Sequence, residues 1–388
     1  AFGSLIGVGA GSVLSIAIGA KDRKTQERLL GVVNRQSIFC TICYMIVALT
    51  FAEPLIAMMG GRGEELALGT SYFRVCTFGA FFWIYGLAGN MIIRAEGKMK
   101  TAAWMMGVGL AANAVFNYIF LGILKMGVEG SAWGANIGML TYTLMSWLYF
   151  GRGKATFRSK LLSLRGDRKI ASSVMRLGMP SLIMSLMGLI QGLVVFNALA
   201  RYGTTADIAF YGVVYRIFQF LLTPIFGLFR ALQPVIGINY GAKQYDRVIL
   251  AYKVFAVAAL VLTLPFWFIS LAAPGSILGM MLKDTVFTGT HFLYFRVYMA
   301  ILPALAFLFM AMTLFPAVDK GKPAMIIGLA RQFVFYVPVM LLLPKFIGIG
   351  GIYYGSLAID TIMVLWTMAL VKKEFNSLRQ RQAAEDVA

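Results

Sequence analysis

The chain has 388 residues, of which 60% are hydrophobic and 13% are charged, whereas soluble proteins average about 45–50% apolar and about 25% charged residues. With a mean hydropathy of +0.78, this composition excludes a soluble globular protein and predicts an all-α polytopic membrane protein. The net charge of +19 does not indicate nucleic-acid binding, because the basic residues cluster between apolar stretches rather than on one soluble face.

Eleven apolar stretches are long enough to cross a bilayer, which takes about 20 residues as a helix. Five lie in the first part of the chain, at 2–19, 31–51, 67–93, 102–122 and 130–150. After a basic segment, six more follow at 177–200, 206–240, 248–272, 287–315, 323–343 and 349–371. We expect Pro224 and Pro234 to bend the long stretch at 206–240, and Pro303 to break the span at 287–315.

The chain contains an internal repeat. Gly19-Ala20-Lys21 and Gly241-Ala242-Lys243, which lie 222 residues apart, each end an apolar stretch and begin a polar one. Gly tolerates the backbone conformation that ends a helix. The positive charge of Lys is favourable next to both the last carbonyl groups of a helix and the lipid head groups. Two further matches follow in the same order: Glu96-Gly97-Lys98 with Lys320-Gly321-Lys322 at 224, and Gly127, Gly130 and Gly134 with Gly348, Gly351 and Gly355 at 221. Three matches predict two copies of one membrane unit.

The repeat predicts the domain organisation. The span at 177–200 has no partner in the first copy, because the repeat spacing places that partner before Ala1. We therefore expect a twelve-helix protein that lacks its first helix here. Its parts are an amino-terminal lobe at 1–150 (helices 2–6), a cytoplasmic basic linker at 151–176, a carboxyl-terminal lobe at 177–372 (helices 7–12) and a cytoplasmic tail at 373–388. Parallel repeats of this kind carry a substrate site between the two halves.

The basic residues predict the orientation in the membrane. If 151–176 is inside, the inside segments hold most of the Lys and Arg residues, and the outside segments hold mainly Arg62, Lys125, Arg201, Lys283 and Lys345. Within the linker the basic residues include Arg152, Lys154, Arg158, Lys160, Arg165, Arg168 and Lys169. Short cytoplasmic loops are enriched in Lys and Arg, so the carboxyl terminus should also be cytoplasmic.

Four polar residues within the spans are candidates for binding substrate or a coupling ion. Asp360 lies near the middle of its span, where an ionised group costs several kcal/mol unless it is paired or solvated. It is either functional or part of a structural ion pair with Arg331, Arg216 or Arg230. Asn113 and Asn117 share one helix face and could ligate a cation or bond a neighbouring helix. Gln191 has the same two interpretations.

Other motifs favour packing over chemistry. Gly3, Gly7 and Gly11 are spaced four residues apart, as are Gly130, Gly134 and Gly138, which predicts close contacts between helices. The cysteines fall in apolar stretches and are expected to be small buried residues, and His291 is the one histidine, which excludes a histidine metal cluster.

The corner motifs resemble those of the multidrug and toxic compound extrusion (MATE) family. Gln233-Pro234-Val235-Ile236-Gly237-Ile238-Asn239-Tyr240-Gly241-Ala242 is similar to its bacterial branch, and Arg94-Ala95-Glu96-Gly97-Lys98 and Leu177-Gly178-Met179-Pro180 also fit. The resemblance covers essentially the whole chain after the first helix. It implies two six-helix lobes, a central cavity, and export of mostly cationic amphipathic compounds in exchange for H+ or Na+, without a cofactor.

The sequence departs from that family at three carboxylates. An aspartate on the first helix is absent, Asn117 stands where an Asp often follows Asn113, and Gly188 stands where some branches have Glu. We therefore expect a multidrug efflux antiporter, not an enzyme, acting as a monomer in the bacterial inner membrane. The alternative is a flippase for lipid-linked oligosaccharides, for which Arg216, Arg230 and Arg296 would supply cationic groups. A membrane-embedded enzyme ranks last, because no cluster of His, Cys or carboxylates is evident.

Overall fold

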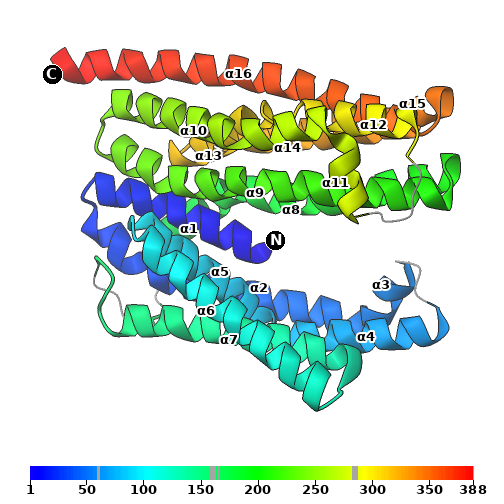
Figure 1. Cartoon of the computed structure of the whole chain (residues 1–388). Helices are drawn as coiled ribbons and strands as arrows, with labels where there is room; N and C mark the ends of the chain where they lie inside the picture. The colour runs from blue at the N-terminus through cyan, green and yellow to red at the C-terminus, as the bar shows by residue number, and fades with distance from the viewer. Residues whose placement is uncertain (59–61, 158–162, 165, 282–286, 388) are drawn as a thin grey trace. The chain divides into compact units, whose positions relative to one another are not determined.

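The structure is a computed structural model that describes residues 1–58, 62–157, 163–164, 166–281 and 287–387. Every regular element within these ranges is a helix (Figure 1), so the predicted all-α fold class is confirmed. Four residues used in the charge argument, Arg158, Lys160, Arg165 and Lys283, lie outside the described residues.

The chain divides into two compact units, Ala1–Met179 and Pro180–Ala388. The first unit contains α1 (Phe2–Gly19), α2 (Arg23–Thr50), α3 (Ala52–Met58), α4 (Gly63–Phe78), α5 (Ala80–Ala95), α6 (Met99–Asn117), the π-helix η1 (Tyr118–Ile123), α7 (Gly127–Gly151) and the start of α8 (Arg168–Tyr202). The second contains the rest of α8, then α9 (Thr205–Gly241), α10 (Tyr245–Ala272), α11 (Pro274–Met281), α12 (Gly289–Ala300), α13 (Leu305–Ala317), α14 (Gly321–Leu329), the π-helix η2 (Ala330–Tyr336), α15 (Val337–Ile347) and α16 (Gly350–Val387).

The predicted spans correspond to these helices, with two differences. Within the described ranges, nine helices are long and apolar enough to cross a membrane, or ten if the bent pair α4 and α5 is one span. The helix α7 covers the predicted span at 130–150 but is not among them. Its sequence includes Asn136, Thr141, Thr143 and Ser146, which lower its hydropathy.

The predicted span at 67–93 is two helices that meet at an angle of 50°. The break lies at Gly79, where a Cβ atom would be only 2.1 Å from the Oδ1 atom of Asn136 on α7. The Nδ2 atom of Asn136 donates a hydrogen bond to the carbonyl oxygen of Val75 at 2.6 Å. A polar side chain inserted into a helix in this way is a known cause of sharp bends.

Proline acts differently in two predicted spans. At 287–315 the helix is interrupted as expected, because α12 ends at Ala300 and α13 begins at Leu305, with Pro303 between them. At 206–240 the chain forms one helix of 37 residues, α9, with Pro224 and Pro234 inside it.

The repeat is visible in the backbone at the helix ends. Lys21 and Lys243 have φ of 55° and 58°, and Gly97 and Asp319 have φ of 81° and 60°. At each of these four positions the chain closes with the same pattern, in which the next residue's N–H donates to the carbonyl five residues earlier. This arrangement is the Schellman motif. Residues that lie 222 apart therefore end two pairs of helices in the same way.

Two details of the predicted repeat were wrong. The left-handed residue at each Gly-Ala-Lys corner is the lysine, while Gly19 and Gly241 are the last residues of their helices. The second match is also shifted: Lys98 and Lys320 precede the first residues of α6 and α14, so Lys98 corresponds to Lys320 and not to Lys322. The third match agrees, since Gly127 and Gly348 have φ of 63° and 60°.

Small residues bring helices together in the amino-terminal unit, as predicted. Cβ atoms on Gly3 and Gly7 of α1 would contact Ile84 and Ala88 of α5 at 3.3 Å and 3.2 Å. On α7, Gly134 and Gly138 face Asn117 and Asn113 of α6. In a membrane such close packing replaces the hydrophobic effect as the force between helices.

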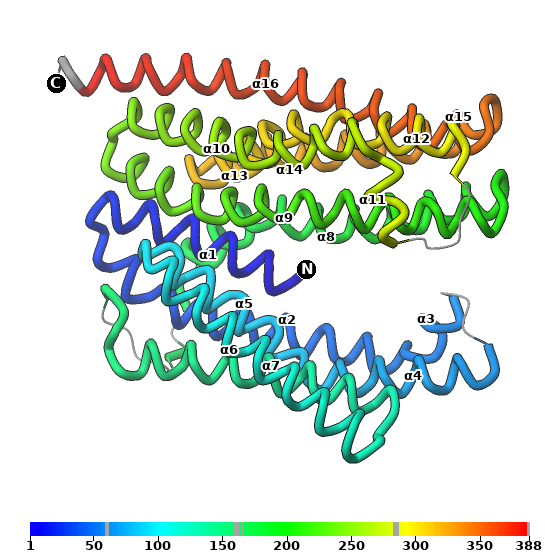
Figure 2. Tube along the Cα trace, viewed as in Figure 1, coloured from blue at the N-terminus to red at the C-terminus, as the bar shows by residue number. Residues whose placement is uncertain are grey.

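Several helices extend beyond the apolar stretches. The polar segment after the first corner forms the start of α2, where Asp22 accepts a hydrogen bond from the Thr25 N–H at 3.1 Å. α8 begins at Arg168, and α16 continues through the predicted tail to Val387 (Figure 2).

Candidate functional site

The carboxyl-terminal unit encloses a cavity of about 210 Å3 between its own helices. Residues of α8, α9, α12, α13, α14, η2 and α16 line it. Two of the predicted site residues, Asp360 and Gln191, lie in this lining, on α16 and α8. The structure therefore brings together two polar groups that are 169 positions apart in the sequence.

Asp360 forms a buried ion pair with Arg331. The Nε and Nη2 atoms of Arg331 lie 2.9 Å and 2.7 Å from the same carboxylate oxygen, Oδ1. The Asp360 side chain is 7% exposed and that of Arg331 is 25% exposed. Of the three arginines considered as partners, Arg331 is the one in contact, and Arg216 is exposed on α9. The pair satisfies the charge of Asp360 and also lines the cavity.

The π-helix η2 presents Arg331 to the cavity. It carries Arg331, Gln332 and Tyr336, all of which line the cavity. Pro338 lies two residues after the end of η2. A proline lacks an N–H and crowds the preceding turn, so the wider turn of η2 lies where a regular α-helix would be strained. Single turns of π-helix are frequent at functional sites.

Several polar groups around the ion pair lack full hydrogen bonding. Gln332 is 1% exposed, and neither end of its amide has a hydrogen-bond partner among the described residues. The hydroxyls of Tyr336 and Ser356 interact without completing a hydrogen bond of normal geometry. Buried polar groups usually have partners, so this end of the cavity is suited to a polar ligand or to water.

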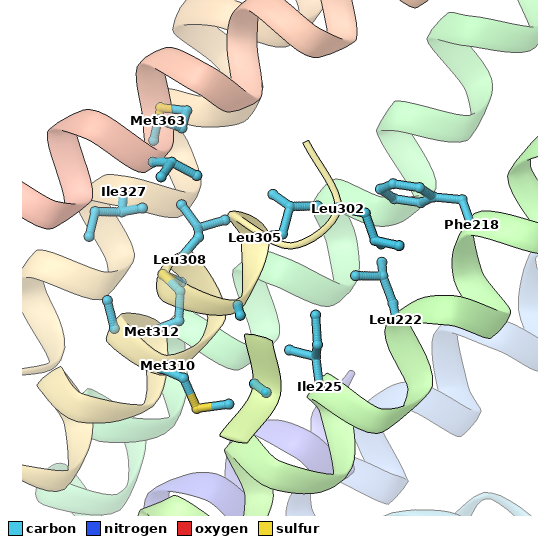
Figure 3. Close-up of a cluster of buried hydrophobic side chains, with 14 of the residues drawn as sticks. Phe218, Leu222, Ile225, Leu302, Leu305, Leu308, Met310, Met312, Ile327 and Met363 are labelled. Carbon is cyan, nitrogen blue, oxygen red and sulfur yellow. The ribbon is translucent and has the colours of Figure 1, made fainter. Parts of the chain in front are cut away.

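The rest of the cavity wall is apolar. Phe218, Leu222, Leu305, Leu308 and Met312 line it and belong to the buried cluster in Figure 3. Met184 and Met187 of α8 also face it. Methionine is flexible and polarizable, so such a wall can adapt to apolar ligands of different shape.

Sequence reasoning missed part of this site. Gln219 lines the cavity and donates a hydrogen bond to the Tyr215 hydroxyl at 2.6 Å. Gln332 was also missed, although Arg331-Gln332 is a conspicuous polar pair in an apolar stretch and could have been found as one. Gly188, the position at which the family resemblance implies Glu in some branches, lines the same cavity, and a Cβ atom there would meet nothing within 4 Å.

Asn113 and Asn117 lie in the amino-terminal unit, on α6. The Nδ2 atom of Asn117 is 3.4 Å from the Oδ1 atom of Asn113, and both side chains pack over glycines of α7. The Oδ1 atom of Asn117 is buried without a hydrogen-bond partner among the described residues. Both interpretations of this pair, helix packing and ligand binding, remain predictions.

The corner lysines lie at helix ends. Lys98 is 3.6 Å from the buried carboxylate of Glu96 and donates to the carbonyl oxygen of Lys154. The same carboxylate accepts hydrogen bonds from the Tyr149 hydroxyl at 2.7 Å and the Thr156 N–H at 3.0 Å. Burial nevertheless raises the pKa of Glu96 above its ordinary value of 4.5.

In the second repeat the lysine has a different partner. Lys320 pairs with Glu374 of α16 at 2.7 Å, while Lys243 pairs with Glu385 at 2.8 Å. Lys322, the residue first matched to Lys98, is exposed. The lysine position is thus shared by the repeats, and the carboxylate that it contacts is not.

Comparison with known proteins gives consistent results. A model of the MatE family matches residues 1–119 and 179–342. Multidrug export protein MepA of Staphylococcus aureus (strain MSSA476) is 26% identical over 377 residues, which cover 95% of this chain and 81% of that protein. A crystal structure of MATE in the bent conformation superposes with a TM-score of 0.92 at 22% identity, covering 98% of this chain and 85% of the other. The outward-facing conformation of a multidrug resistance MATE family transporter of the MOP superfamily gives 0.90 at 23%, covering 97% and 85%. At these identities, likeness to the solved structures shows the fold.

Proposed function

Because the chain belongs to the MatE family, we propose that it is a secondary active multidrug efflux transporter of a bacterial membrane, which exchanges amphipathic small molecules for protons or sodium ions. The resemblance drawn from the corner motifs is confirmed by this membership. The observation that supports the proposal most directly is the cavity of the carboxyl-terminal unit, which combines adaptable apolar walls with one polar end around Arg331 and Asp360. The relative from S. aureus is named as a multidrug export protein.

Transport is proposed to occur by alternating access. Within this unit alone, the cavity of about 210 Å3 is smaller than the roughly 300–1,000 Å3 of typical sites for drug-sized ligands. A drug-sized cargo therefore requires the site to widen. The break between α12 and α13 and the π-helix η2, both at the cavity, are places where the helices could adjust. One similar structure is described as outward-facing.

Asp360 is proposed to couple cargo to the counter-ion. It is the carboxylate among the described residues that line the cavity. Protonation of Asp360, or binding of Na+ to it, would weaken its hold on Arg331 and so change the polar end of the cavity. An exchanger needs this kind of linkage, because each ligand must favour a different state of the site. A cationic cargo, the class that the family resemblance implies, must compete with Arg331 for Asp360.

The proposal is tested with the purified protein in proteoliposomes. Dyes of different net charge, including ethidium, are offered with an imposed proton gradient, an imposed sodium gradient or neither. Transport of at least one dye that depends on a gradient is the expected result, and the effective gradient identifies the coupling ion. Equal dye distribution under all three conditions would contradict secondary active transport.

Orientation and assembly belong to the same proposal. The protein acts as a monomer, with its carboxyl terminus in the cytoplasm. The flippase alternative required a cavity rimmed with cationic residues. In the described part of the lining, Arg331 is the cation present, and it is paired with Asp360. This cavity therefore favours the efflux function.

A further inference from the structure

The charges that face the cavity add to zero. Among the 22 described residues that line it, Arg331 and Asp360 carry the charges. The arginine is the more accessible of the two, at 25% against 7% side-chain exposure. A cargo in the cavity therefore lies near both charges, and the arginine is the less buried of the two.

The geometry of the ion pair leaves groups available on both partners. Both guanidinium contacts end on Oδ1 of Asp360, so the pair uses neither Oδ2 of the carboxylate nor Nη1 of the arginine. These two groups form a neighbouring acceptor and donor. The unpaired amide of Gln332 adds another donor and acceptor to the lining of the same cavity. A ligand group that carries both charges can thus be satisfied without breaking the pair.

We propose that Arg331 is a specificity-determining residue, which makes this cavity select amphipathic zwitterions over permanent cations of the same shape. A cation near Asp360 lies close to Arg331, and like charges repel strongly where water is scarce. A zwitterion offers its positive group to Oδ2 and its negative group to Nη1, so the repulsion is offset. Specificity of this kind comes from a built-in repulsive group as well as from attraction. The inference rests on the proposed function, since it assigns the cargo class of the same cavity.

A matched pair of dyes tests the proposal. Rhodamine 110 carries a free carboxylate and is a zwitterion in its open form, and rhodamine 123 is its methyl ester and a cation. Equilibrium binding of each dye to the detergent-purified protein is measured by fluorescence anisotropy. We expect the wild-type protein to bind rhodamine 110 more tightly by about tenfold, which is a modest discrimination for closely placed charges. Equal affinity, tighter binding of rhodamine 123 or binding of neither dye would overturn the proposal.

Two variants test the role of Arg331 itself. Arg331→Gln frees Asp360, and we expect the preference to reverse in favour of rhodamine 123. Gly188→Glu adds a carboxylate to the cavity lining at a position where a Cβ atom meets nothing within 4 Å, and it keeps both residues of the ion pair; we expect it to raise the affinity for rhodamine 123. Arg216→Gln removes an exposed charge from α9 outside the cavity lining and should keep the wild-type preference. An unchanged preference in Arg331→Gln would refute the assignment.

Arg331→Gln leaves a buried carboxylate without its partner and could fail to fold. The double variant Arg331→Gln/Asp360→Asn removes both charges and is the second test. We expect it to bind the two dyes within about twofold of each other, since the site then lacks charge of either sign. A double variant with the wild-type preference would overturn the proposal. These measurements need no ion gradient, so a protein that selects rhodamine 110 but moves no dye refutes transport and leaves the binding specificity intact.

Discussion

Gly9 of α1 and Gly178 of α8 lie where two helix backbones touch. A Cβ atom on Gly9 would be 2.0 Å from the carbonyl oxygen of Val174, and one on Gly178 would be 1.8 Å from the carbonyl oxygen of Leu5. Contacts under 3 Å are not seen for real Cβ atoms, and here the obstacle is backbone rather than a movable side chain. The crossing of α1 and α8 therefore depends on both glycines.

The first prediction concerns this crossing. Gly178→Ala should force α1 and α8 apart and sharply lower the yield of folded protein, because a backbone atom cannot move aside as a rotamer can. Size-exclusion chromatography of the detergent extract measures the yield. Gly107→Ala is the control, since a Cβ atom there meets nothing within 4 Å. Normal yield of Gly178→Ala would show that the two helices do not pack in this way.

The second prediction concerns the corner at Lys21, where φ is 55°. A non-glycine residue in the left-handed conformation costs about 1–2 kcal/mol. Lys21→Gly should therefore raise the thermal unfolding temperature, although the added freedom of the unfolded chain offsets part of the gain. Lys21→Val should lower it, because a branched Cβ is worse still in this conformation. The reverse order of the two variants would contradict the assigned conformation.

The third prediction separates structure from function at Asp360. Asp360→Asn leaves Arg331 unpaired, and loss of one partner of a buried ion pair costs about 3–5 kcal/mol, so we expect lower folded yield and no export. Asp360→Asn/Arg331→Gln should restore the yield and not the export. Dye export and yield are measured on the same preparations, with the exposed Asp246→Asn as control. Wild-type export by the double variant would make the pair purely structural.

The fourth prediction concerns pH. Since burial raises the pKa of Glu96 in the folded protein, its contribution to stability is fully present below 4.5 and is lost as the pH rises through the raised pKa. In Glu96→Gln the side chain is uncharged at every pH. The unfolding temperature of this variant should therefore rise relative to that of the wild-type protein between pH 4 and pH 8.

A variant at a carboxylate whose pKa is shifted in the opposite direction controls for general effects of pH. The pKa of Asp167 is lowered mainly by a hydrogen bond from Arg28. The contribution of Asp167 to folding stability is therefore present above the ordinary pKa of an aspartate and is lost as the pH falls through the lowered pKa. The unfolding temperature of Asp167→Asn should therefore fall relative to that of the wild-type protein as the pH rises. If the unfolding temperatures of both variants, relative to wild type, change with pH in the same direction, the raised pKa assigned to Glu96 is wrong.

The fifth prediction concerns topology. After Cys40, Cys43 and Cys76 are replaced, single cysteines are introduced at Lys345 and Lys372, which are both exposed. An impermeant maleimide should label position 345 in intact cells and position 372 only after permeabilisation, because basic residues concentrate on the cytoplasmic side. Labelling of position 372 from outside would invert the predicted orientation.

Much of the fold follows from local sequence. Apolar runs located the spans, because about 20 apolar residues are needed to cross a bilayer wherever the helix packs. Pro303 marked a break because proline restricts its own backbone. The Gly-Ala-Lys corners were located from composition, but the left-handed residue was misassigned, because Lys21 and Lys243 adopt a conformation that glycine would adopt more easily.

Features that depend on contacts between distant residues could not be predicted. The bend at Gly79 requires Asn136, which is 57 residues away and supplies the side chain that enters the break. Asp360 was found because it is charged in an apolar span, but three arginines were equally good partners until the fold brought Arg331 to it. Lys98 was matched to Lys322, at a spacing of 224, because both lysines follow a glycine. The helix ends instead match Lys98 with Lys320, at the repeat spacing of 222.

One helix, α16, reaches from the cavity to the turn between α9 and α10. Asp360 and Arg381 lie on this one helix, 21 residues apart, which is roughly 30 Å at 1.5 Å per residue. At its far end Arg381 donates to the Tyr240 hydroxyl at 3.1 Å, and Gln382 accepts from the Tyr245 N–H at 2.9 Å. If α16 tilts or slides when Arg331 releases Asp360, we expect the turn between α9 and α10 to move with it, because these two hydrogen bonds join them. A spectroscopic probe at that turn would then report on an event deep in the membrane.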